Sequence, residues 1–235
     1  MATIYEVAKQ AGVSPKTAAR ILAGERGRPK NRERVLTAAR KLGYVRNQQA
    51  ANLRSGKSGL IGVIVPDISN PTYPGFIQTI YETATKNGYQ VLLSSTFGKT
   101  SEEVLALRMF EINRVEGIIL NAAEGEGDED CDAILERFVS RGVPIVLAGR
   151  PVRNLPVDQI ILQNVSATRR AVSYLTKVGH KKLGFITGPN DTLGSQERRK
   201  GFVQALTAAG IKPEPKWMLD GDFTAESGRQ QAIQL

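Results

Sequence analysis

The sequence contains very little of the chemistry on which metal sites and covalent catalysis depend. Among its 235 residues there is one cysteine, Cys131, and one histidine, His180. A single cysteine excludes an intramolecular disulfide and a CxxC zinc site, and it is typical of a protein from a reducing compartment. One histidine cannot supply a histidine cluster, and a Ser-His-Asp triad is not expected either. We therefore predict that the protein uses neither a metal nor a cofactor.

Membrane segments and nucleotide-binding motifs are missing from the sequence as well. The longest apolar run covers residues 60–65 and is far too short to cross a bilayer. The N-terminus has neither the basic nor the apolar region of a signal peptide, so we expect a cytoplasmic protein without a membrane partner. No GxxxxGK[ST] motif is present, and no GxGxxG motif follows a strand. Because no acid–base pair can be singled out either, the sequence predicts a non-enzyme.

Positive charge is abundant, and all of its excess lies near the N-terminus. The chain has 32 Lys and Arg against 23 Asp and Glu, a formal net charge of +9. Residues 1–58 hold 13 basic and 3 acidic side chains (+10), which leaves 19 and 20 (−1) for residues 59–235. Such a basic segment indicates a polyanionic partner, whereas the remainder has the balanced charge of an ordinary globular domain.

The first 45 residues are predicted to form three short helices. Thr3 and Glu6 have the spacing of a capping box, and Gly12 is placed to end the first helix. Ser14, followed by proline, begins the second helix, and Pro29 begins the third. Two helices joined by such a short turn are typical of the helix-turn-helix arrangement, whose second helix reads DNA.

A polar linker, residues 46–58, follows this head. It could form two helical turns from an Asn47 N-cap, but Leu53 is its only large apolar residue. With so little to bury against its own protein, the linker is expected to become ordered only when it meets a partner.

Strands and helices alternate from residue 59 onward. This order predicts an α/β core with a parallel, doubly wound sheet, whose ligand site lies beyond the carboxyl ends of the strands. A second capping box is predicted from Thr100 to Glu103. The apolar runs that we interpret as strands are residues 60–65, 91–93, 117–120, 145–148, 160–162 and 183–186.

Three motifs closely resemble the lactose/galactose-repressor family of bacterial transcription regulators. They are Thr3 to Thr17 (TIYEVAKQAGVSPKT), Leu42 to Tyr44 (LGY) and Ile61 to Pro71 (IGVIVPDISNP). Weaker similarity continues through residues 178–182 and 195–202, so the resemblance extends along the whole chain. The N-terminal motif is long enough to make a chance match implausible.

The resemblance implies a homodimeric repressor that binds a near-palindromic operator in double-stranded DNA. It implies a helix-turn-helix domain at 1–45, a hinge helix at 46–58, and an effector-binding and dimerisation core of the periplasmic-binding-protein type at 59–235. Within that core, one subdomain would cover about 59–160 and the other about 161–235. Because family cores pass twice between their subdomains, the second would be incomplete here, as in a fragment or truncated product with exposed apolar surface.

The resemblance also assigns DNA-contacting roles. Lys16 at the start of the second helix can donate to guanine, and Pro15 can contact a thymine methyl. Two departures stand out: Ala19 lacks the usual hydroxyl, and Arg46 replaces a proline. The alternatives are that Thr3 and Ser14 are plain N-caps, that Lys16 and Arg20 are solvated surface charges, and that Leu53 packs against the core. The assigned residues are Pro15, Lys16 and Arg20 for bases, Thr3, Tyr5, Ser14, Thr17 and Asn47 for phosphates, and Ala50 and Leu53 for the minor groove.

Effector contacts are implied by position, and a sugar or related metabolite is the expected ligand. For each of these residues a purely structural role is the alternative. Gly149 and Gln163 replace aspartates found in many relatives, which predicts that the ligand is not held in the commonest sugar mode. The residues are Tyr73, Asn121, Arg150, Ser195, Arg198 and Phe223.

A second interpretation of the sequence treats the core as a cytoplasmic solute-binding module with a non-functional DNA-binding head. The missing signal peptide counts against a periplasmic role for such a module. Binding of a sugar without affinity for DNA would favour this interpretation over the repressor.

Overall fold

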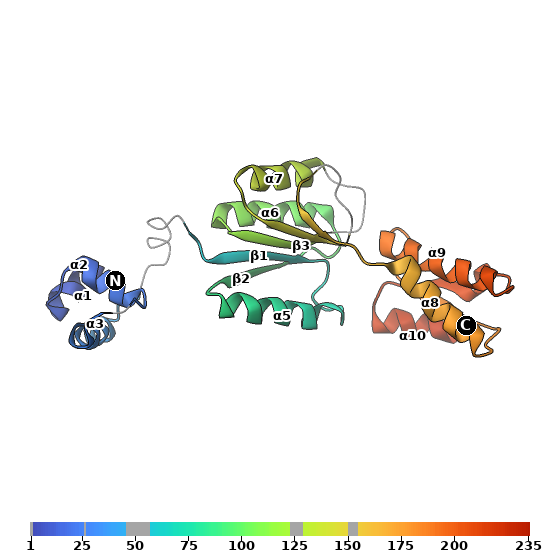
Figure 1. Cartoon of the computed structure of the whole chain (residues 1–235), viewed down its shortest axis with the longest axis horizontal. Coiled ribbons are helices and arrows are strands. Elements are labelled where there is room, and N and C mark those ends of the chain that lie inside the picture. Colours follow the sequence, from blue (N-terminus) through green and yellow to red (C-terminus); the bar gives the residue numbers. More distant parts are fainter. Residues whose placement is uncertain (1, 26, 46–56, 123–128, 150–154) are drawn as a thin grey trace. The chain divides into compact units, whose positions relative to one another are not determined.

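The computed structural model describes residues 2–25, 27–45, 57–122, 129–149 and 155–235 (Figure 1). The chain divides into two compact units, residues 1–57 and residues 58–235, and each is described by itself. The predictions for Asn47, Ala50, Leu53 and Arg150 lie outside the described residues.

The first unit is a head of three helices, α1 (Ile4–Ala11), α2 (Pro15–Leu22) and α3 (Pro29–Lys41). The predicted all-α head is confirmed, and so is the predicted end of α1, where Gly12 adopts φ +62° in the left-handed region. All three helices contribute to one small core, which contains Val7, Ala8, Ala11, Ala18, Ile21, Val35, Ala38 and Ala39.

The second unit contains a five-stranded sheet in which every pair of neighbouring strands is parallel. The strand order β2-β1-β3-β4-β5 places the first strand near the middle, as expected for a doubly wound α/β fold. The predicted α/β core is thus confirmed. The strands are β1 (Leu60–Val65), β2 (Gln90–Ser95), β3 (Gly117–Asn121), β4 (Ile145–Ala148) and β5 (Asp158–Ile160). The first four are connected in turn by the helices α5 (Tyr73–Lys86), α6 (Thr100–Asn113) and α7 (Glu129–Ser140).

The two faces of this sheet are covered by different helices. Helices α6 and α7 lie on one face and α5 on the other (Figure 1). The main core lies beneath α6 and α7, where Ile64, Phe110 and Leu120 are fully buried. Gly62 is required at its position in β1, because a Cβ atom there would be 2.3 Å from the Phe110 ring. Close packing of α6 on the sheet therefore depends on this glycine.

A smaller sheet lies in the C-terminal part of the second unit. Strands β6 (Phe185–Thr187) and β7 (Met218–Asp220) form a parallel pair. The Phe185 ring stacks on Phe202 with 4.7 Å between ring centroids. Gly201 permits close helix packing, since a Cβ atom there would be 2.4 Å from the Val165 carbonyl oxygen. The accompanying helices are α8 (Asn164–Lys177), α9 (Leu193–Ala208), the 3₁₀ turn η1 (Pro215–Trp217) and α10 (Ala225–Gln234).

Three local predictions are wrong. The strand predicted at 183–186 instead covers Phe185–Thr187, because these are the residues that pair with β7. The capping box at Thr100 does not form: α6 begins at Thr100 itself, Lys99 is its N-cap, and no side chain caps the helix. The strand predicted at 160–162 instead covers Asp158–Ile160, because β5 pairs with β4 through these three residues. Ile161 and Leu162 follow the strand and are 58% and 57% exposed.

None of the helices in the described ranges is long and apolar enough to cross a membrane. In the same ranges, no group of three or more His, Cys, Asp or Glu side chains is placed to hold a metal ion.

Candidate nucleic-acid interface and effector site

The start of α2 is fixed by two hydroxyl side chains. Ser14 is the N-cap, and its Oγ accepts a hydrogen bond of 3.2 Å from the backbone N–H of Thr17. The Ser14 and Thr17 hydroxyls are also 2.8 Å apart and share a hydrogen bond. Pro15 occupies the first helical turn, where its missing N–H costs nothing. The N–H groups of Thr17 and Ala18 both donate to Ser14, so the backbone N–H of Lys16 is the one that this first turn can offer to an anion such as a phosphate.

The three predicted base-reading residues share the exposed face of α2. Pro15, Lys16 and Arg20 are all exposed, whereas Ala18 and Ile21 are buried in the core of the head. Lys16 and Arg20 are four residues apart and therefore lie one above the other on the helix surface. The structure brings these three residues together on one exposed side of the helix.

The start of α1 holds two of the predicted phosphate contacts. The capping box is confirmed: the Thr3 backbone N–H donates to Glu6 Oε2 over 2.7 Å, and the Glu6 N–H donates to Thr3 Oγ1 over 3.3 Å. Donation to the Glu6 carboxylate from the Thr3 backbone N–H, and next from the Thr3 hydroxyl, lowers the pKa of Glu6. Tyr5 is 67% exposed and presents its ring to solvent. The Thr3 hydroxyl also donates to Glu6, so Thr3 has a structural role whether or not it contacts DNA.

Residues of α3 add positive charge to the head. Lys30, Arg32 and Arg34 lie in its first two turns, and all three are exposed. Arg34 lies over Gly12, where a Cβ atom would be 2.3 Å from its Nη2 atom. The turn between α1 and α2 therefore has a guanidinium group against its backbone.

Arg20 has a partner that was not predicted from the sequence. Its Nε atom donates to Glu25 Oε2 over 2.6 Å, and both side chains are more than half exposed. The signal for this pair is Gly24, which directly follows the C-cap Ala23: a glycine there reverses the chain and brings the next residue, Glu25, back to the last turn of α2.

Two predicted effector residues lie at the carboxyl edge of the five-stranded sheet. Asn121 is the last residue of β3, and Tyr73 is the first residue of α5 after the loop that follows β1; both are half-buried. Gly149 follows β4 with φ +90°, and a Cβ atom there would be 3.0 Å from Asn121 Oδ1. The Asn121 amide thus lies beside the backbone of Gly149, the position at which the family resemblance leads us to expect an aspartate.

Three further predicted residues lie at the carboxyl edge of the β6–β7 sheet. The Ser195 hydroxyl is buried and accepts a hydrogen bond of 2.7 Å from Thr192 Oγ1, so Ser195 supports the start of α9. Arg198, one turn further along α9, is half-buried. Phe223 is 45% exposed and covers Gly188, where a Cβ atom would be 1.9 Å from its ring. Phe223 and the start of α9 thus border the end of β6.

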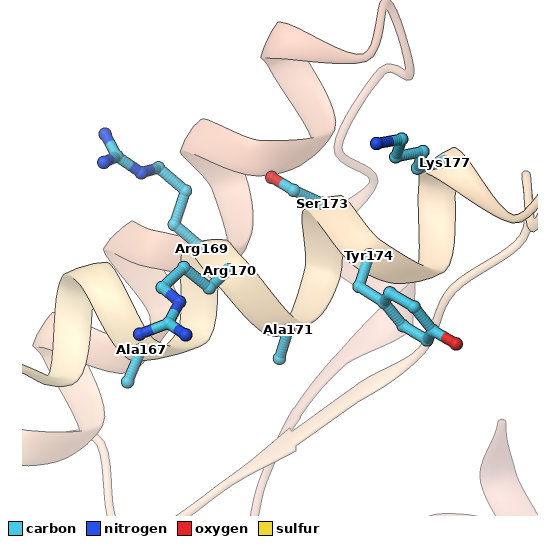
Figure 2. Close-up of a pocket in the computed structure, with 7 residues that line it drawn as sticks. All are labelled: Ala167, Arg169, Arg170, Ala171, Ser173, Tyr174 and Lys177. Carbon is cyan, nitrogen blue, oxygen red and sulfur yellow. The ribbon is translucent and has the colours of Figure 1, made fainter.

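A shallow hollow of about 720 Å³ lies elsewhere, along α8. Figure 2 shows Arg169 and Lys177 extending from one side of the helix and Ala171 and Tyr174 from the other. Among the described residues, none of the predicted effector residues lines this hollow.

The first unit is a basic three-helix head whose second helix is exposed. The second unit is a parallel α/β core with polar and aromatic residues at its strand ends. Together they define the class of ligand-responsive DNA-binding regulators. Residues 3–47 match the family described as bacterial regulatory proteins, lacI family. Residues 58–235 match the periplasmic binding proteins and sugar binding domain of the LacI family. The chain belongs to the LacI family.

Individual relatives agree with this assignment. The chain is 33% identical to the HTH-type transcriptional regulator DegA of Bacillus subtilis (strain 168), over 99% of this chain and 69% of DegA. It is 33% identical to the HTH-type transcriptional repressor CytR of Escherichia coli (strain K12), over 100% of this chain and 67% of CytR. The Lac repressor dimer bound to operator and the anti-inducer ONPF has a TM-score of 0.80 at 28% identity, over 99% of this chain and 69% of that structure. These relatives are transcription regulators.

Proposed function

We propose that this protein is a transcriptional repressor that binds a near-palindromic operator as a homodimer and whose DNA affinity is set by a small-molecule effector. The observation that carries the proposal is the exposed face of α2, where Pro15, Lys16 and Arg20 lie together above a hydroxyl-capped helix start. The operator-bound Lac repressor dimer and the CelR–cellobiose complex are similar in fold, which supports DNA and a sugar as the two ligands.

Sequence reading follows from the chemistry of α2 in a major groove. Lys16 and Arg20 donate to guanine O6 and N7, and Pro15 offers apolar contact to a thymine methyl. Phosphate contacts hold the helix in register without reading sequence. In this proposal they come from Thr3, Tyr5, Ser14, Thr17 and Asn47.

The hinge supplies a second, minor-groove contact. Leu53, the only large apolar residue of the polar segment 46–58, is suited to wedge between base pairs, and Ala50 permits close approach to the groove. We propose the domain arrangement 1–45 for reading, 46–58 for the hinge and 59–235 for the effector and dimer contacts. We also propose that the protein acts in the cytoplasm, where it meets its operator, and that it is not an enzyme.

The effector is proposed to be a sugar or related polar metabolite. Support comes from the strand ends of the core, which offer amide, hydroxyl and guanidinium donors beside aromatic rings, a combination suited to a polar ring. The residues are Tyr73, Asn121, Arg150, Ser195, Arg198 and Phe223. Because Gly149 cannot offer a carboxylate, we expect the Asn121 amide to provide the polar contact at that strand end.

The proposal is tested by selecting bound sequences from a random DNA pool and measuring affinity for the selected site by fluorescence anisotropy. Lys16→Ala and Leu53→Ala should each weaken specific binding about five- to 150-fold, because each removes about 1–3 kcal/mol of base or step recognition. Lys86→Ala, the same change on α5, is the control and should leave binding unaltered.

Unchanged specific binding in both Lys16→Ala and Leu53→Ala would contradict the proposed repressor function. Calorimetry that detects sugar binding together with no DNA affinity at low salt would favour the solute-binding module with a non-functional head.

A further inference from the structure

The turn after α2 has a defined backbone geometry. Gly24 donates its N–H to the Ile21 carbonyl over 3.0 Å, and Glu25 donates its N–H to the Arg20 carbonyl over 3.1 Å. Gly24 has a φ of +86°. These two hydrogen bonds with a glycine in the left-handed region make a Schellman motif, which closes the helix by turning the chain back on its last turn.

The motif brings the side chains of Arg20 and Glu25 together. These two positions of a Schellman motif usually hold apolar residues in contact. Here they hold an ion pair instead, in which Arg20 Nε donates to Glu25 Oε2 over 2.6 Å. The side chains are 59% and 52% exposed, so the pair contributes little to stability. Since the backbone bonds alone form the turn, the Glu25 side chain is free to serve another purpose.

The ion pair with Glu25 leaves the two terminal amino groups of Arg20 available. A guanidinium group has five N–H donors in a rigid fork, and the hydrogen bond to Glu25 uses the one on Nε. Both terminal amino groups remain to donate to guanine O6 and N7, the commonest specific contact in a major groove. A long side chain held in one orientation before binding also loses less rotamer entropy when it meets the base.

We propose that Glu25 is a positioning residue that determines specificity by holding Arg20 ready for a guanine. The inference rests on the proposed DNA-binding function. It has a distinctive consequence, because a carboxylate beside DNA repels the phosphates. Glu25 therefore lowers non-specific affinity while it raises discrimination between bases, and its removal should shift these two quantities in opposite directions.

The head offers a matched control for the charge. Its acidic residues are Glu6, Glu25 and Glu33. Glu6 takes part in the α1 capping box, whereas Glu33 is exposed on α3 and has no part in the turn after α2. Glu33→Ala and Glu33→Gln thus remove the same charge without touching Arg20.

The experiment measures the affinity of the full chain for the selected operator, for the same site with the guanine opposite Arg20 replaced, and for random duplex DNA. Glu25→Ala should raise random-DNA affinity about two- to fivefold, as Glu33→Ala does, because each removes a negative charge. Glu25→Ala alone should reduce the preference for guanine about three- to tenfold. Glu25→Gln keeps an acceptor for Nε and should retain most of that preference.

The outcomes separate the inference from the proposed function. If the wild type shows no preference for any site, the proposed function fails. If the wild type is specific and Lys16→Ala weakens it, but Glu25→Ala keeps the guanine preference of Glu33→Ala, the inference is overturned. A gain in guanine preference with Glu25→Ala would also overturn it, since Glu25 would then compete with the base.

Discussion

Gly149 shows how a single residue can alter the carboxyl edge of the five-stranded sheet. Its φ of +90° lies in the region that favours glycine, and the space beside it contains Asn121 Oδ1 at 3.0 Å and the Ala122 carbonyl at 3.3 Å from a Cβ position. An aspartate there would have to adopt a strained backbone and displace the Asn121 amide. The departure from the family pattern is therefore accompanied by a local arrangement that depends on glycine.

We expect Gly149→Asp to destabilise the core by about 2–4 kcal/mol, from backbone strain and crowding together. The control is Gly88→Asp, which has a similar φ of +81° but no atom within 4 Å of the new Cβ, so it reports the strain alone. Urea denaturation followed by far-ultraviolet circular dichroism measures both variants. Equal losses of stability would show that the contact with Asn121 carries no cost.

Residue roles were harder to predict than residue positions. The hydroxyl caps at Thr3 and Ser14 follow from spacing alone, because a cap depends on three or four consecutive residues. The contact of Arg20 with Glu25 depends on the geometry of a turn, which residue spacing alone does not define. Ser195 was predicted as a ligand contact, and its buried hydrogen bond to Thr192 could not be inferred from the pattern.

At the scale of elements, a charge cluster joins α6 to α7. Glu111 on α6 accepts hydrogen bonds from Arg137 Nε at 3.1 Å and Nη2 at 3.0 Å, and Arg141 Nη1 lies 3.3 Å away. Arg137, through its hydrogen bonds, is the main cause that lowers the pKa of Glu111. A bidentate pair with a mostly buried carboxylate is stronger than an ordinary surface pair.

Glu111→Gln should reduce the free energy of unfolding at neutral pH by about 1 kcal/mol. The loss is small because solvent screens both arginines, which are well exposed. Because the folded pKa of Glu111 is lowered, its contribution is present above the ordinary value of 4.5 and is lost as the pH falls through the folded pKa.

The urea midpoint of wild type and Glu111→Gln should therefore converge on acidification. Glu226→Gln on α10 breaks an exposed pair with Arg229 and should change stability much less than Glu111→Gln does. A constant difference between wild type and Glu111→Gln at every pH would contradict the role of this carboxylate.

Elements were predicted well where a long apolar run or a capping signal was present. β1 and β4 match their predicted bounds because buried parallel strands read as continuous apolar runs. β7 was missed, since Met218–Asp220 is three residues long and contains only two apolar side chains. β5 was displaced because the exposed pair Ile161 and Leu162 continues the apolar run beyond the paired residues.

At the scale of the molecule, charge is divided sharply between +10 in residues 1–58 and −1 in the rest. The affinity for DNA should fall steeply with salt, because each neutralised phosphate contributes a slope of about −0.9 to log K against log salt concentration. Lys30→Ala with Arg32→Ala should make that slope shallower by about 0.9 for each phosphate that the variant no longer neutralises. Lys86→Ala on α5 should leave the slope unchanged, and an unaltered slope in the double variant would argue against phosphate binding by α3.

The pairing of β6 with β7 has a consequence for how the protein stays a single species. Within the described residues each of these strands is bonded on one side only, whereas β1, β3 and β4 are bonded on both. An unbonded strand edge is a template for any extended segment that reaches it. The two edges of the small sheet can be covered by water, by charged side chains or by another stretch of polypeptide. This covering decides whether copies of the protein remain separate or join edge to edge.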